Sequence, residues 1–315
     1  SEDSSILNIL LQTKNNQQLP QEIIRDIISE RIAWHLCSSS LFEPFAITLE
    51  RTGIALFYKE LDINKYAILE QLSALEKQKN FDPFQLLSSM RSRYAEPIKD
   101  NIGIIRDYEQ LSKRKSFLSK SKDLYKPIFD ELQALIGGSF KSIDGQVFYR
   151  PKKERNRDAV LVPVYLSSSS VKSLFLIDFY VNCLAEEKGL LIIDEPELNL
   201  HPDNQRRMGS LLARLVNAGI KIIITTHSDY LVREVNNRIM LNNNLDNKEE
   251  LMKRNKFLDE DILRPEQVSA YTLGAKHRIE KIKVDKHGID LRIIDELIAD
   301  SNQVADDIYY SIQES

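Results

Sequence analysis

Two adjacent carboxylates, Asp194 and Glu195, follow the apolar run LLII at residues 190–193. The run predicts a strand that is buried on both faces, and open α/β sheets place their ligands at the carboxyl ends of such strands. Because desolvation of two neighbouring carboxylates is costly, we expect a cation to compensate them, and Mg²⁺ favours carboxylates combined with nucleotide phosphates. In this hypothesis Asp194 orients the Mg²⁺ shell and Glu195 polarises an attacking water. The alternative is that both carboxylates only cap the following turn.

Serines and a histidine lie on either side of this pair in the sequence. Serines fill positions 167–170, just before a predicted helix, where small hydroxyl residues cap the helix and leave backbone N–H groups free for phosphate. His227 ends another apolar run, so it could contact a γ-phosphate or the attacking water at the same sheet edge. Taken alone, the serines could equally be an ordinary cap and His227 an ordinary loop histidine.

An alternation of apolar strands and amphipathic helices positions these residues. We expect helices at 171–186 and 202–218 and strands at 190–194 and 220–226, which indicates βα units around a parallel sheet. A hairpin is predicted over 140–150, turning at Asp144-Gly145, and a second hairpin-like segment covers 159–165. Beyond these, strands are expected at 268–273 and 278–284, followed by a helix that begins near Asp290.

The amino-terminal part is predicted to be mostly helical. Residues 1–36 have helical periodicity, and a strand over 45–49 leads through Arg51-Thr52-Gly53 into a further helix. Residues 62–135 are polar and helix-rich and are interpreted as a helical insertion. The basic cluster in this stretch is either a solvated helix face or a surface that binds DNA or a partner protein; it consists of Lys113, Arg114, Lys115, Lys120 and Lys122.

Composition limits the class of protein. The 315 residues are 42% apolar and 29% charged, which favours a globular protein with a substantial core. The net charge of -4 gives no overall nucleic-acid signal. Cys37 and Cys183 lie far apart without CxxC spacing, so we expect packed thiols in a reducing compartment. With no leader-like start and no apolar run long enough to span a bilayer, we expect a cytoplasmic protein without a membrane partner.

The ordered motifs resemble those of ATP-binding-cassette (ABC) ATPases. The sequence DEPELNLHP at 194–202 is similar to their Walker B motif followed by the D-loop, residues 166–171 to a degenerate signature motif, and Thr226-His227-Ser228 to their switch histidine. The wording DEPE-x-x-LHP is most similar to the subgroup of overcoming-lysogenization-defect (OLD) ATPases and the ATPase subunits of the PARIS and Septu anti-phage systems, with RecF-like and SMC-like proteins more distant. The similarity is strong over residues 136–235 and weaker over residues 47–61.

This resemblance implies an α/β fold, namely an ABC-type ATPase domain with a mostly parallel sheet, an antiparallel β subdomain and a long helical insertion. Residues 1–61 would be part of the ATPase core, 62–135 the insertion, and 136–315 the rest of the core with its motifs. The implied catalytic residues are Glu195 and His227, and the implied Mg²⁺ ligand is Asp194. The implied nucleotide-binding residues are Ser167, Ser168, Ser169, Ser170, Lys172, Asn199 and His201.

One motif of the resembled family is missing from these residues. A P-loop needs G-x-x-x-x-G-K-[ST] between a strand and a helix, and none of the ten glycines fits that pattern. Gly137-Gly138-Ser139 lacks the lysine and precedes a predicted hairpin strand. The resemblance therefore leads us to expect a Walker A segment upstream of Ser1, with this chain as the carboxyl-terminal part of a longer ATPase.

The function implied by the resemblance is ATP hydrolysis with Mg²⁺ in a homo-oligomer that holds its nucleotides between protomers. In the resembled subgroup such a subunit controls a nuclease or toxin effector for anti-phage defence, although no effector site is recognisable in this sequence. The alternative is a DNA-repair or chromosome-maintenance ATPase of the RecF or SMC type, which would bind DNA in a salt-dependent way. A catalytically inactive scaffold would fit the missing P-loop but not the carboxylate pair, and a transporter ATPase fits least.

Overall fold

A computed structural model describes Arg25, Ser29 and residues 44–61, 94–152, 160–273 and 277–313. Contacts divide the chain into two compact units, Ser1–Glu43 and Pro44–Ser315. In the first unit only Arg25 and Ser29 are described, and both are helical, so the rest of the helix expected over 1–36 lies outside the described residues, as does Cys37. Within the described part of the chain, no helix has the length and apolar character needed to cross a membrane.

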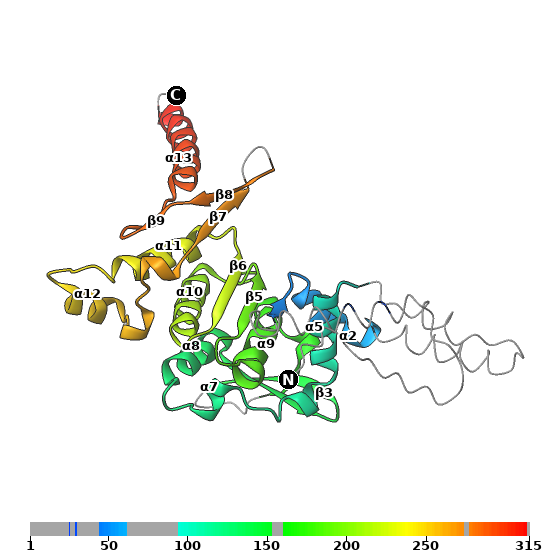
Figure 1. Cartoon of the computed structure of the whole chain (residues 1–315). Helices are drawn as coiled ribbons and strands as arrows, with labels where there is room; N and C mark the ends of the chain where they lie inside the picture. Colours follow the sequence, from blue (N-terminus) through cyan, green and yellow to red (C-terminus); the bar gives the residue numbers. More distant parts are fainter. Residues whose placement is uncertain are drawn as a thin grey trace, which may run out of the picture. The chain divides into compact units, whose positions relative to one another are not determined.

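The centre of the second unit is a parallel sheet (Figure 1). Its strand order is β1 (Pro44–Ile47), β5 (Leu190–Asp194) and β6 (Lys221–Thr225). Ile47 pairs with Ile193, and Asp194 pairs with Thr225, so the three strands end side by side. The α/β fold class and the strand at 190–194 are therefore confirmed.

One face of this sheet carries the apolar core. Leu191 and Ile193 of β5 are fully buried with Ile47. The opposite face is less covered in the described residues: Leu190 and Ile192 are half-buried, and Ile223 of the edge strand β6 is 53% exposed. The expectation that β5 is buried on both faces is therefore wrong for the second face, because apolar residues in every position do not by themselves require cover on both sides.

Three helices pack around the core of the sheet. They are α2 (Arg51–Leu61), α9 (Ser169–Phe179) and α10 (Pro202–Asn217). Helix α9 is buried along most of its length, including Lys172, and it continues as a π-helical segment η2 (Tyr180–Leu184). Helix α10 is amphipathic and buries Met208, Leu211 and Leu215. Helix α2 follows β1 after residues 48–50, and Arg51-Thr52-Gly53, expected to lead into this helix, form its first turn.

A separate antiparallel sheet follows helix α8 (Lys126–Ile136). Strands β2 (Gly138–Ile143) and β3 (Gln146–Pro151) form the predicted hairpin, and β4 (Val162–Pro163) adds to β3. The turn residues Asp144 and Gly145 have φ angles of 50° and 73°, as a two-residue type I′ turn requires. The 3₁₀ turn η1 (Val164–Leu166) then leads into the serine-rich loop.

The described part of the predicted insertion packs into the main core. It comprises the helices α5 (Glu96–Arg106), α6 (Tyr108–Leu111), α7 (Phe117–Lys120) and α8 (Lys126–Ile136). Buried side chains from these helices, such as Ile105, Leu118 and Leu132, belong to the same apolar cluster as those of α9 and α10. Residues 62–93 lie outside the described residues, and the boundaries 62 and 135 stay a prediction. The basic cluster at 113–122 is exposed.

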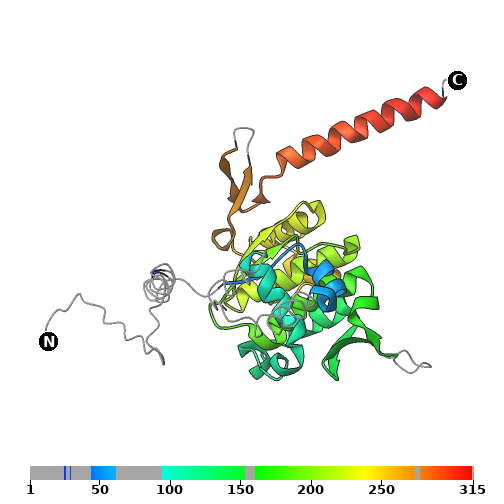
Figure 2. The ribbon, with the colours of Figure 1, turned by 90° about the vertical axis from the view of Figure 1, so that its right-hand side faces the viewer.

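The carboxyl-terminal elements follow β6. They are α11 (Asp229–Met240), α12 (Lys248–Asn255), the 3₁₀ turns η3 (Asp259–Asp261) and η4 (Pro265–Gln267), β7 (Ala270–Leu273), β8 (Ile279–Ile282), β9 (Val284–Asp285), β10 (Gly288–Ile289) and α13 (Arg292–Gln313). Figure 2 shows α13 as one unbroken helix. The strands and terminal helix expected after residue 268 are confirmed.

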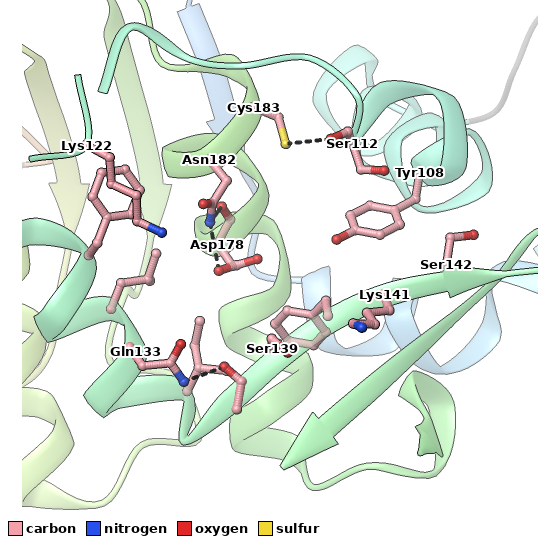
Figure 3. Close-up of a pocket in the computed structure, with 15 residues that line it drawn as sticks. Tyr108, Ser112, Lys122, Gln133, Ser139, Lys141, Ser142, Asp178, Asn182 and Cys183 are labelled. Carbon is pink, nitrogen blue, oxygen red and sulfur yellow. Dashed lines mark hydrogen bonds between the residues drawn. The ribbon is translucent and has the colours of Figure 1, made fainter. Parts of the chain in front are cut away.

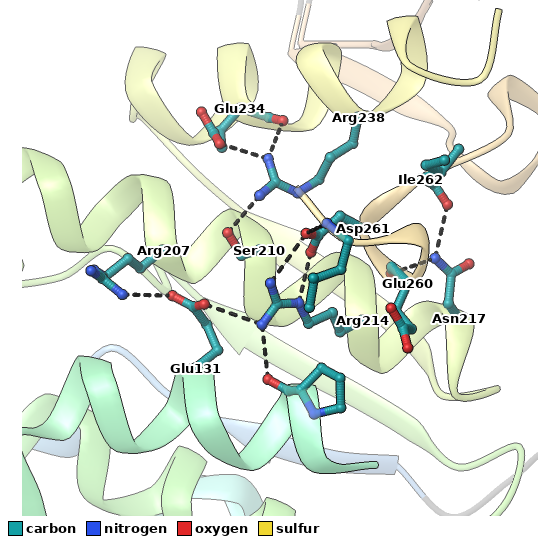
Figure 4. A network of polar contacts seen from close by, with 12 residues as sticks. Glu131, Arg207, Ser210, Arg214, Asn217, Glu234, Arg238, Glu260, Asp261 and Ile262 are labelled. Carbon is teal, nitrogen blue, oxygen red and sulfur yellow. Dashed lines mark hydrogen bonds and ion pairs between the residues drawn. The ribbon is translucent and has the colours of Figure 1, made fainter. Parts of the chain in front are cut away.

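A buried ion-pair network fixes η3 against α8 and α10 (Figure 4). Arg214 donates Nε to Asp261 Oδ1 at 2.7 Å and a second hydrogen bond to Oδ2 at 3.1 Å. It also contacts Glu131 at 3.1 Å. Burial alone would lower the pKa of Arg214, but the hydrogen bonds and charge of Asp261 raise it. Because all these groups are paired, we interpret the network as structural and not as a ligand site.

Candidate nucleotide-hydrolysis site

Asp194 and Glu195 lie at the carboxyl edge of the parallel sheet, next to the end of β6. Asp194 Oδ1 accepts a hydrogen bond from Thr225 Oγ1 at 3.0 Å. The Glu195 backbone N–H donates to the Thr225 carbonyl at 3.1 Å. The pairing of β5 with β6 thereby places both carboxylates at the edge where parallel sheets bind ligands.

The backbone turns sharply at this point. Glu195 has a φ of 44° and Asn199 a φ of 60°, both in the left-handed region that is rare for residues other than glycine. The turn is closed by hydrogen bonds from Leu198 N–H to Glu195 O (2.9 Å) and from Leu200 N–H to Glu197 O (3.0 Å). Such strain is concentrated at functional sites, and here it turns the chain out of strand β5 at Glu195.

His227 faces Glu195 across the gap between the two strand ends. Its Nε2 lies 3.8 Å from Glu195 Oε1. The imidazole is 90% exposed and the Glu195 side chain 30% exposed, so both are accessible to a ligand. The structure therefore brings together three of the predicted residues, Asp194, Glu195 and His227.

Glu197 holds the loop that carries His227. It is buried, and its Oε1 accepts from Thr226 Oγ1 at 2.6 Å, His227 N at 3.0 Å and Ser228 N at 3.1 Å. Its second oxygen, Oε2, is buried without a hydrogen-bond partner in the described structure. Sequence analysis gave Glu197 no role, although it stands in the motif DEPE two residues after Glu195.

We predict that Glu197→Ala lowers the free energy of unfolding by about 2–4 kcal/mol, because the Thr226 hydroxyl and the His227 N–H lose their acceptor and the Ser228 N–H keeps only Thr226 Oγ1. Glu197→Gln keeps an oxygen in place and should cost less than half as much. Urea denaturation followed by circular dichroism measures both, with the exposed Glu187→Ala as a control. Equal effects of the alanine and glutamine variants would contradict this assignment.

Arg51 joins the three elements beneath the site. It is fully buried at the start of α2. Its guanidinium donates to the carbonyls of Ser173 (3.1 Å), Thr48 (3.2 Å) and Asp194 (2.6 Å), and also to that of Glu195. One side chain thus links the end of β1, helix α9 and the end of β5.

The charge of Arg51 also faces the acidic residues of the site. Burial lowers the pKa of Arg51 to about 10, against the opposing effect of Glu197, Glu195 and Asp194. The guanidinium therefore stays charged at neutral pH and partly balances these carboxylates. The sequence placed Arg51 between a predicted strand and a predicted helix, but it did not reveal these contacts.

The serine-rich loop forms a second group of predicted residues. Ser168 caps α9, accepting from Val171 N at 3.3 Å, and Ser168 and Ser169 are exposed. Ser167 Oγ donates to the Val164 carbonyl at 2.6 Å. Lys172 is buried, and its ammonium donates to the carbonyls of Ser167 (2.9 Å) and Tyr165 (3.4 Å). These contacts fit a role for Lys172 in shaping the loop, and its contact with nucleotide stays a prediction.

The turn after the carboxylates contacts this loop. Ser170 Oγ donates to the Asn199 carbonyl at 2.6 Å, and Asn199 Nδ2 donates to Thr52 Oγ1 at 3.2 Å. His201 caps α10 by accepting from Asp203 N at 3.4 Å, and its side chain is mostly exposed. The structure thus places Asn199 beside the serine-rich loop, whereas His201 contacts neither group of predicted residues in the described structure.

The donor set at the sheet edge fits Mg²⁺. Across the described residues, no group of three or more His, Cys, Asp or Glu side chains could hold a metal by itself. Mg²⁺ bound by one or two carboxylates, with phosphate and water completing its shell, does not need such a group. Asp194 has one carboxylate oxygen on Thr225 and could offer the other to the ion.

Comparison with known proteins identifies the domain type. A family model described as an AAA ATPase domain matches residues 5–232, a range that contains every predicted site residue. A search of curated proteins found no match. The family match supports an ATPase of the AAA and RecF-like class and is coarser than the resemblance to anti-phage ATPases. Since the match spans most of the chain, the chain belongs to the AAA ATPase domain family.

Proposed function

We propose that this chain hydrolyses ATP with Mg²⁺ at the edge formed by Asp194, Glu195 and His227. The observation that carries this proposal is the convergence of two carboxylates and an exposed histidine at the ends of adjacent parallel strands, in a chain of the AAA ATPase family. Mg²⁺, when bound, neutralises phosphate charge at this edge.

The residues have distinct roles in this proposal. Asp194 holds the metal, while Glu195 accepts the proton of the attacking water as general base. His227 lies within reach of the same reaction space and contacts the terminal phosphate or that water. Glu197 and Arg51 touch no substrate; they position the two loops that do.

A complete site needs further groups on the nucleotide. The sequence has no G-x-x-x-x-G-K-[ST], and we propose that residues encoded before Ser1 supply this loop. We also propose that the exposed Ser168 and Ser169 act on the nucleotide of a second copy, with backbone N–H groups of α9 facing its phosphates. Two copies would then enclose each ATP between them.

A subunit-mixing experiment tests the shared site. Ser169→Glu should repel phosphate while leaving the helix start intact, and Asp194→Asn should remove the metal ligand. Each variant alone should be inactive in the full-length gene product. After random exchange in a dimer, half the dimers contain one intact composite site, so about a quarter of wild-type activity should return.

The control is each variant incubated alone under the same conditions. Subunit exchange is verified by fluorescence transfer between labelled copies. No recovery in mixtures that do exchange subunits would contradict the shared site, while leaving hydrolysis at Asp194 and Glu195 to be judged by their own variants.

On the resemblance of DEPE-x-x-LHP, we propose that hydrolysis controls a nuclease or toxin effector in anti-phage defence. The alternative, a DNA-maintenance ATPase, draws support from the exposure of the basic cluster at 113–122. The two roles differ in the partner bound, an effector protein or DNA, and not in the chemistry of the site.

A further inference from the structure

A pocket of about 510 Å³ lies between α6, α8, β2 and the carboxyl-terminal half of α9 (Figure 3). None of its lining residues belongs to the candidate hydrolysis site. Its volume is in the range of small-molecule sites and exceeds what an ion or a single water would occupy. The polar groups that line it therefore determine which class of ligand would fit.

A carboxylate and a phenol point into this pocket. Asp178 Oδ1 accepts from Asn182 Nδ2 at 3.0 Å, and no other hydrogen bond reaches the carboxylate within the described structure. Tyr108 is 7% exposed, and its hydroxyl has no hydrogen-bond partner among the described residues. Figure 3 shows this hydroxyl and the Asp178 carboxylate directed toward each other. Both groups line the pocket and have hydrogen-bonding capacity that a ligand there could use.

The electrostatics agree with an incompletely satisfied carboxylate. Burial raises the pKa of Asp178 to about 7, although the Asn182 hydrogen bond and the charge of Lys122 lower it. Burial also raises the pKa of the neighbouring Tyr108 hydroxyl. A ligand group that donates hydrogen bonds to Asp178 would offset this desolvation.

The rest of the pocket provides an apolar wall and two cations. Phe129, Leu132 and Phe140 line the wall. Lys122 and Lys141 are exposed lining residues, and in the view of Figure 3 they approach from opposite sides of Asp178. Lys122 Nζ lies 5.0 Å from the centre of the Phe129 ring. Neither lysine makes an ion pair with a carboxylate in the described structure, so both ammonium groups are available to bind an anionic ligand.

We propose that this pocket binds a nucleoside monophosphate. An N–H edge of the base would bond to the Asp178 carboxylate and the Tyr108 hydroxyl, the ring would lie against the apolar wall, and the phosphate would face Lys122 and Lys141. Guanine presents two adjacent N–H donors to a carboxylate, so GMP is the probe of choice.

Isothermal titration calorimetry on the full-length gene product tests this site. GMP should bind saturably, whereas guanosine and ribose 5-phosphate, which each lack one half of the ligand, should bind at least roughly tenfold more weakly. In buffer above the Asp178 pKa of about 7, Asp178→Asn should weaken GMP binding roughly tenfold or more, because a charged acceptor is lost. The same change at the exposed Asp123, in the neighbouring turn, should have no effect. Lys122→Ala should weaken binding, and Lys120→Ala should not.

Two further variants distinguish binding in this pocket from misfolding and from binding at the ATP site. Tyr108→Phe removes the hydroxyl but keeps the ring that packs 5.2 Å from Phe175, so weaker GMP binding in this variant reports the hydroxyl and not misfolding. Asp194→Asn should leave GMP binding intact, which distinguishes the pocket from the ATP site. The proposal fails if GMP, AMP and CMP all show no saturable binding, if both pocket variants bind like wild type, or if binding disappears with Asp194→Asn.

Discussion

Replacing Glu195 by glutamine should slow ATP turnover by roughly 10²–10⁴-fold, the usual contribution of a general base. Glutamine has nearly the same shape but cannot accept a proton from water. The Glu195 N–H bond to Thr225 is made by the backbone and is unaffected, so the turn and ATP binding should persist. The full-length variant should therefore accumulate in its ATP-bound assembly, as measured by steady-state hydrolysis together with nucleotide retention.

The matched control is Glu187→Gln, the same change at an exposed position before β5. Wild-type turnover in purified Glu195→Gln protein would refute the assignment of Glu195 as base. The same pair of variants also examines the proposed defence role. If hydrolysis controls an effector, a host that expresses the gene with its neighbours should lose phage protection with Glu195→Gln and keep it with Glu187→Gln.

Replacing Arg51 by methionine should lower the free energy of unfolding by about 3–5 kcal/mol, because four backbone carbonyls lose a charged hydrogen-bond donor at once. Methionine fills much of the same space but cannot donate to the carbonyls of Ser173, Asp194 and Glu195. It also leaves the buried Glu197 without the nearby positive charge. Chemical denaturation followed by circular dichroism measures the loss, and hydrolysis should fall in the fraction that remains folded.

The control for this variant is Arg233→Met. Arg233 is half-exposed, and its ion pairs with Asp229 and Asp295 lie at the surface, so its removal should cost less than about 1 kcal/mol. If Arg51→Met is no more destabilising than Arg233→Met, the buried guanidinium does not hold the three elements together. Arg51→Lys should fall between the two, because an ammonium cannot reach all the carbonyls at once.

Local pattern was sufficient to predict the elements that carry the carboxylates. The apolar run at 190–193 and the strand before His227 have the composition of buried parallel strands, and the structure has them at β5 and β6. Asp144-Gly145 predicts its turn because both residues tolerate positive φ. Because β5 and β6 are parallel neighbours, Glu195 and His227, which follow their ends, lie close together.

Contacts that depend on tertiary packing could not be predicted in this way. Nothing near Arg51 in the sequence shows that its guanidinium reaches the end of β5, and nothing near Glu197 shows that it accepts from the His227 loop. The helices after residue 94 read as a polar insertion because their charged faces dominate the sequence, yet side chains such as Ile105 complete the core. The Asp178 pocket likewise arises only when α6, α8 and α9 meet.

The contacts of Arg51 also bear on how the protein folds. Its partners Ser173 and Asp194 are 122 and 143 residues away along the chain, so closing these contacts costs loop-closure entropy. Contacts of such high sequence separation slow folding and form together with the native topology. The edge that carries Asp194 and Glu195 should consequently form only together with the native topology, and partly folded chains should have no activity at all instead of a reduced one.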